Sequence, residues 1–151
     1  MDSIKIDTIK KVKERTEKML SLMGISAKIM VLGEEGAIRV NISSKESPLL
    51  IGHHGENLFA MRHILSLVCR DLLPVGTAFM LDVDDYFKER QERLEKMVAS
   101  AARRVKNTGK KEDLPAMNAY ERRLVHQFAS QFGVESSSEG QGEERRVVLK
   151  K

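Results

Sequence analysis

The sequence is poor in several residue types, and each shortage excludes a class of protein. A single cysteine, Cys69, occurs among 151 residues, which rules out an intramolecular disulfide and a four-cysteine zinc site. Tryptophan is absent and aromatic residues make up 5% of the chain, so the core has to be mainly aliphatic. No unbroken apolar run is longer than four residues, whereas a membrane-spanning helix needs about 20. We therefore expect no membrane insertion.

The remaining composition is that of a folded protein. Hydrophobic residues make up 41% of the chain and charged residues 32%, with only three prolines, which is unlike disordered or collagen-like sequences. Residues 1–7 lack the apolar segment of a secretory signal. Together with the lone cysteine, this pattern predicts a location in the cytoplasm.

The excess of positive charge lies in one segment. The formal net charge is +4 at pH 7. Residues 1–87 carry 11 basic and 12 acidic side chains, residues 112–151 carry 6 and 7, and residues 88–111 carry 9 and 3. The segment 88–111 is therefore the strip that a polyanionic partner would contact.

Hydrophobic periodicity predicts two small domains of mixed structure. Apolar residues three and four apart predict helices at 4–23, 56–72, 86–107 and 118–131. Alternating apolar residues predict strands at 25–31, 38–42, 79–83, 134–138 and 145–149. With a short helix from Ser47, the first domain has the order α-β-β-α-α-β. The predicted fold class is α+β, with domains at 1–84 and 85–151.

Gly52 and Gly55 bracket two histidines between two predicted helices. Glycines at this spacing let the backbone turn sharply and let another backbone approach closely. The first N–H groups of the helix that starts here have no partner within that helix, which favours a bound phosphate. The other interpretation is that the glycines only form a tight corner between helices.

With this loop, residues 4–84 resemble a type II KH domain, whose Gly-X-X-Gly loop clamps about four nucleotides of single-stranded RNA or DNA. The resemblance implies a three-stranded sheet with helices on one face. It also implies RNA contacts by the loop residues Gly52, His53, His54 and Gly55, by Ile51 and Leu58 in the adjacent groove, and by Arg39 at its rim. Many loops of this family carry Lys or Arg in place of the two histidines, so this loop should attract phosphate less strongly at neutral pH.

Arg122 and His126, four residues apart, share one face of the predicted helix at 118–131. Residues 114–126, together with the closing hairpin, resemble the R-three-H domain, a single-stranded nucleic-acid domain named for its Arg-x-x-x-His signature. The resemblance implies that Arg122, Arg123 and His126 contact the ligand, and a planar guanidinium suits phosphate pairing or base stacking. His126 could instead be held by a neighbouring backbone carbonyl.

A KH domain followed by an R-three-H domain is similar to the organisation of the Jag family, the SpoIIIJ-associated RNA-binding proteins of bacteria. The resemblance implies RNA binding in the cytoplasm linked to cell elongation, envelope synthesis or sporulation. It also implies a homodimer, or a heterodimer with a small single-KH protein. The N-terminal Jag-N domain of many members is not expected in this sequence.

The helix predicted at 86–107 connects the two domains and carries most of the basic residues. Its second half and the residues after it contain no acidic side chain up to Lys111, so Arg103, Arg104 and Lys106 are predicted to contact RNA. In its first half acidic and basic residues alternate, which favours ion pairs within the helix.

We therefore predict a protein that binds single-stranded RNA, with single-stranded DNA as a further ligand, and that catalyses no reaction. The sequence contains no P-loop, Gly-x-Ser-x-Gly or paired-acid motif, and we expect no cofactor. The histidines do not have the spacing of a metal site. The alternative is a protein-interaction or dimerisation module in which nucleic-acid binding is secondary.

Overall fold

The computed structural model describes residues 4–151. Residues 1–3, which the predicted first domain includes, lie outside the described residues. The chain divides into two compact units, one ending at Tyr86 and the other beginning at Phe87. Both units combine helices with a small sheet, which confirms the α+β class.

The first unit has the predicted order of elements. Its helices and strands are α1 (Ile6–Leu22), β1 (Lys28–Glu34), β2 (Ala37–Ser43), α2 (Ser47–Ile51), α3 (Glu56–Val68) and β3 (Ala78–Val83). The sheet order is β1-β2-β3, with β1 antiparallel and β3 parallel to β2. Parallel neighbours need a long crossover, and α2, the glycine loop and α3 form it. The assignment of this unit as a KH domain stays a prediction.

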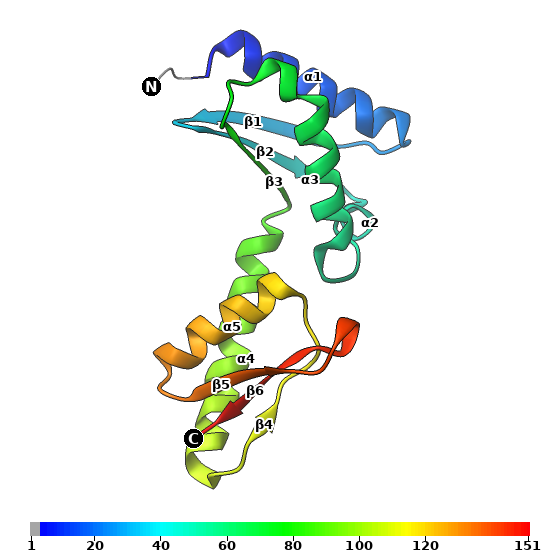
Figure 1. Ribbon diagram of the computed structural model, residues 1–151. Helices are drawn as coiled ribbons and strands as arrows, with labels where there is room; N and C mark the ends of the chain where they lie inside the picture. Colours follow the sequence, from blue (N-terminus) through cyan, green and yellow to red (C-terminus); the bar gives the residue numbers. More distant parts are fainter. Residues whose placement is uncertain (1–3) are drawn as a thin grey trace. The chain divides into compact units, whose positions relative to one another are not determined.

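The core of the first unit lies between the sheet and its helices. Figure 1 shows α1 and α3 on the same side of the three strands. Ile38, Val40 and Ile42, alternate residues of the central strand, are all 0% exposed, as the period of two requires. Cys69 at the end of α3 is also buried, and its burial raises the pKa of the thiol.

The second unit is built on the long helix α4 (Tyr86–Thr108), whose first residue belongs to the first unit. The other elements are β4 (Glu112–Asp113), α5 (Ala119–Gln131), β5 (Glu135–Glu139) and β6 (Arg146–Lys150), with sheet order β4-β6-β5. Figure 1 shows β5 and β6 as the predicted hairpin, with β4 beside β6. The strand β4 was not predicted, because its two residues are polar.

One continuous core holds the second unit together. The apolar stripe of α4, including Leu94, Val98 and Val105, packs in one cluster with Phe128 of α5 and Leu149 of β6. The apolar side of α4 therefore packs with the C-terminal elements. This packing leaves the basic faces of α4 outside the core, where Arg103, Arg104 and Lys106 are exposed.

Candidate nucleic-acid interface

The glycine loop has backbone angles that few residues other than glycine adopt. Gly52 has φ 70° and Gly55 has φ 82°, and His54 between them has φ 51°. Left-handed angles cost a residue with a Cβ about 1–2 kcal/mol. The two glycines therefore allow the chain to pass from α2 into α3 within four residues.

Asn57 fixes the entry to this loop. Its side-chain amide donates a hydrogen bond of 2.8 Å to the carbonyl of Leu49 in α2. A Cβ on Gly52 would lie only 2.6 Å from Cγ of Asn57, so only glycine allows this approach. Both the positive φ of Gly52 and its close approach to Asn57 therefore require glycine at this position.

The loop ends at the amino end of α3. Gly55 is the N-cap residue, and glycine has no side chain that could accept a capping hydrogen bond. The first N–H groups of a helix have no partner within the helix, and they favour an anion. The geometry at this end of α3 is therefore suited to a phosphate.

The two histidines lie next to each other on this loop. The centroids of the His53 and His54 rings are 4.1 Å apart, with their planes at 74°. His53 is exposed and His54 is half-buried. Both are therefore near any ligand held at the start of α3.

The structure places two other predicted contacts differently. Leu58 is 0% exposed, so it supports the loop from within the core and offers no surface to RNA, while Ile51 is half-buried. Arg39 alternates with buried residues of β2 and so lies on the opposite face, where it donates to Glu34 at 2.9 Å. It is paired with Met80, three residues before the end of β3. Arg39 therefore lies on the face of the sheet opposite the buried side chains of β2.

In the second unit, Arg122 and His126 lie on one face of α5 and are both half-buried. Arg122 donates one hydrogen bond of 2.8 Å to the carbonyl of Met117. This bond uses one N–H of a guanidinium that has five. Arg122 therefore keeps donors for a phosphate, and the next residue, Arg123, is exposed.

His126 is held by two serines of β5. Its Nδ1 lies 2.7 Å from the hydroxyl of Ser136 and its Nε2 lies 2.8 Å from that of Ser138. Sequence reasoning missed both serines, although alternate residues of a strand share one face. Because both ring nitrogens are already hydrogen-bonded, the exposed part of the ring is left for stacking. A hydroxyl pair, and not the backbone carbonyl considered from the sequence, holds the ring.

The basic residues of α4 that were predicted to contact RNA differ in their surroundings. Arg104 forms an ion pair with Glu112, at 2.5 Å between Nη2 and Oε1. Lys106 lies beside Gly133, just past the end of α5, since a Cβ there would be 3.3 Å from its Nζ. Arg122 is in the first turn of the same helix, about 16 Å away along the axis at 1.5 Å per residue.

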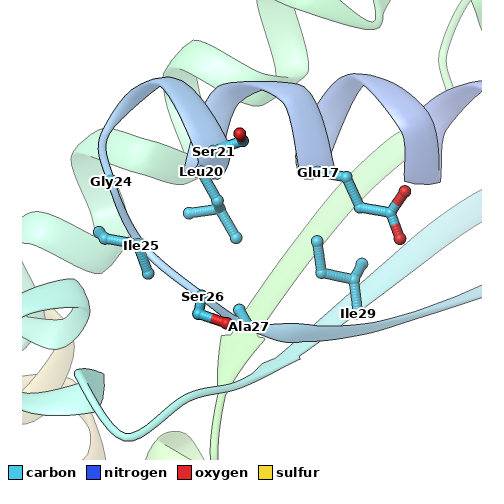
Figure 2. Close-up of a pocket in the computed structure, with 8 residues that line it drawn as sticks. All are labelled: Glu17, Leu20, Ser21, Gly24, Ile25, Ser26, Ala27 and Ile29. Atoms are coloured by element: carbon cyan, nitrogen blue, oxygen red, sulfur yellow. The ribbon is translucent and has the colours of Figure 1, made fainter.

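Two shallow depressions elsewhere hold no charged cluster. Figure 2 shows one between α1 and β1, where Glu17 is the only charged residue among the eight that line it. Another lies beside His126 and is lined by the amide side chains of Gln91, Gln127 and Gln131. Over residues 4–151, no three His, Cys, Asp or Glu side chains come together as a metal site would require.

Comparison with known proteins agrees with the second motif. Residues 92–151 match the family model of the R-three-H domain, which is the domain expected from Arg122 and His126. The match covers α5 and the whole second sheet. Within the described part of the chain, no helix is both long and apolar enough to cross a bilayer.

Three curated relatives are each named "RNA-binding protein KhpB". The protein from Lactiplantibacillus plantarum is 31% identical over 84% of this chain, and the aligned part is 40% of that protein. The protein from Clostridium symbiosum is 29% identical over 90% of this chain and 63% of its own length. The protein from Bacillus subtilis is 25% identical over 96% of this chain and 71% of its own length. The chain thus spans less than two thirds of the first two.

Proposed function

We propose that this chain, an R-three-H protein related to the KhpB proteins of the Jag family, binds single-stranded RNA and catalyses no reaction. The observation that carries the proposal is the glycine loop. It places a glycine, which has no capping side chain, at the amino end of α3 and two histidines beside it. We also propose that the protein acts in the cytoplasm.

In this proposal the loop and Arg122 contact the RNA separately. The backbone N–H groups at the start of α3 hold a phosphate, and Gly52 and Gly55 let the RNA backbone come close. Arg122 pairs with a second phosphate through the N–H groups that Met117 does not occupy. Two weak contacts on one chain strengthen RNA binding together, because binding at the first raises the effective concentration of the RNA at the second.

Among the basic residues, Arg103 and Arg123 are proposed as the stronger phosphate contacts, because both are exposed. Arg104 is the weaker one, since the carboxylate of Glu112 already neutralises it. Lys106 contacts RNA only if the strand extends past the end of α5. Arg39 and Leu58 are not among the proposed direct contacts.

Binding to labelled single-stranded RNA, measured by fluorescence anisotropy over a series of salt concentrations, tests the proposal. We expect His53→Asp/His54→Asp to weaken binding, because two carboxylates repel phosphate at the start of α3. The control is His63→Asp, which introduces a single carboxylate at an exposed position further along α3 and should weaken binding by less than half as much in free energy. Equal effects of the two variants would overturn the role of the loop.

Arg122→Ala tests the second contact in the same assay. It should weaken binding and reduce the salt slope by about 0.7, the contribution of one phosphate in single-stranded nucleic acid. Arg145→Ala, at an exposed position of the same unit, is the control. An unchanged slope for Arg122→Ala would exclude this arginine as a phosphate contact.

The names of the relatives do not favour the alternative of a protein-interaction module. Pairing with a second copy or with a small KH protein remains part of the proposal. Sedimentation of the chain with and without RNA tests self-association. A stable dimer without RNA affinity at low salt would favour the alternative.

A further inference from the structure

Tyr86 lies directly against the glycine loop, although it is distant from it in the sequence. A Cβ built on Gly55 would lie 3.0 Å from Cε1, 3.3 Å from Oη and 3.4 Å from Cζ of Tyr86. These distances are shorter than ordinary van der Waals contacts, so the ring packs on the bare Cα of the second glycine. Gly55 is buried, although His53 and Glu56 of the same segment are exposed.

The turn after β3 brings Tyr86 to this position. Asp84 has φ 46° and Asp85 has φ 56°, and these two consecutive left-handed residues form the turn between β3 and α4. Non-glycine residues adopt such angles rarely, and aspartate is among those that do. Asp84 also accepts hydrogen bonds from the hydroxyl of Ser47 and, at 3.5 Å, from the backbone N–H of Ser44. The turn therefore contacts α2 at its start and the glycine loop at its end.

The loop has backbone angles that the surrounding structure has to hold. His54 and Gly55 are both left-handed, and the N–H of Gly55 donates a long hydrogen bond of 3.4 Å to Gly52. Unfavourable backbone angles persist only where the surrounding structure holds them. The side chain of Asn57 packs against Gly52 and holds its backbone angles. The ring of Tyr86 packs against Gly55 in the same way.

We propose that Tyr86 is a positioning residue for RNA binding: its ring holds Gly55 so that the N–H groups at the start of α3 face the RNA backbone. This inference rests on the proposed function of the glycine loop. It adds a residue from outside the Gly-X-X-Gly motif. It also makes the first residue of α4 part of the support of the loop.

Two measurements on Tyr86→Ala and Tyr86→Phe test this inference. The first is anisotropy with the same single-stranded RNA. The second is hydrogen exchange of the loop amides without RNA, with the amides of β2 as a reference for global stability. Tyr120→Ala, which changes the other tyrosine of the chain, is the matched control.

We expect Tyr86→Ala to weaken RNA binding by about tenfold and to speed exchange at residues 53–56 by a similar factor, as the loss of one aromatic contact would. Exchange in β2 should stay unchanged. Tyr86→Phe keeps the ring and should stay within about twofold of the wild type in both measurements. Tyr120→Ala should leave loop exchange unchanged.

Unchanged loop exchange in Tyr86→Ala would overturn the inference, and so would a loss in Tyr86→Phe as large as in Tyr86→Ala. If the wild type fails to bind RNA, the proposed function fails, while loop exchange still decides whether Tyr86 holds the loop. If exchange is faster but RNA affinity is unchanged, the positioning role in binding is overturned. The two failures are therefore distinguishable.

Discussion

The guanidinium of Arg90 in α4 donates a hydrogen bond of 2.6 Å to the carboxylate of Glu121 in α5, whose side chain is 1% exposed. The same carboxylate accepts the backbone N–H of Asn118 at 3.3 Å, and the side chain of Asn118 accepts the N–H of Glu121 at 2.9 Å. This capping box starts α5 at Asn118. The buried ion pair therefore connects α4 to the turn of α5 that carries Arg122.

Replacing Arg90 should destabilise the second unit strongly. Arg90→Ala removes the cation from the buried carboxylate of Glu121, which costs about 3–5 kcal/mol of unfolding free energy. The control is Arg93→Ala, which removes a 3.7 Å ion pair with Glu89 on the exposed side of α4 and should cost under about 1 kcal/mol. Urea unfolding measures both. Similar costs for the two variants would contradict the role of this pair.

Gly52→Ala should destabilise the first unit more than Gly36→Ala. Both glycines have φ 70°, but a Cβ on Gly36 meets nothing within 4 Å among the described residues, whereas on Gly52 it meets Asn57. Alanine therefore meets an unfavourable positive φ at both positions, and the difference in unfolding free energy, about 1–3 kcal/mol, includes the clash at Gly52. Asn57→Ala should reduce this difference in a double-mutant cycle. A difference that stays the same without the Asn57 side chain would exclude the clash as its cause.

Removal of the serine hydroxyls that hold His126 should loosen the contact between α5 and β5. Ser136→Ala and Ser138→Ala should each cost about 1 kcal/mol of unfolding free energy, the net value of one hydrogen bond. Ser137, between them, donates instead to Glu139 at 3.4 Å, so Ser137→Ala is the matched control and should cost less. If the three substitutions prove equal in thermal or urea unfolding, the two hydrogen bonds to His126 do not stabilise the unit.

Acidification should remove the contribution of Asp84. The hydrogen bond from Ser47 lowers the pKa of the Asp84 carboxyl. A carboxyl with a lowered folded-state pKa stabilises the fold above its unfolded-state value of about 3.9, and this stability is lost as the pH falls through the folded-state value. The difference in unfolding free energy between wild type and Asp84→Asn should therefore be largest near neutral pH and shrink below about pH 4. A difference independent of pH would show that the charge of Asp84 contributes nothing.

The elements of the fold could be predicted because their signals are local. Periodicity and glycines located the helices and most of the strands, and Gly24, with φ 73°, follows α1 as expected. The strand β4 had no such signal, since Glu112 and Asp113 form a strand only by pairing with β6. Tertiary pairing of two polar residues leaves no pattern in the sequence.

The candidate site could be predicted only as far as its motifs extend. The spacing of Gly52 and Gly55 located the loop, and Arg122 and His126 located the matching face of α5. The burial of Leu58 and the ion pair of Arg39 with Glu34 depend on packing and on strand pairing. Tyr86 lies against Gly55 directly after the two left-handed residues Asp84 and Asp85. No pattern of residue spacing in the sequence indicates the contact between Tyr86 and Gly55.

The most direct test of RNA binding by the glycine loop is a titration of the isotopically labelled chain with single-stranded RNA, followed by amide NMR. We predict that the largest chemical-shift changes fall on the amides of residues 52–57, with a second set around Arg122. RNA binding that leaves the amides of residues 52–57 unmoved would contradict the account.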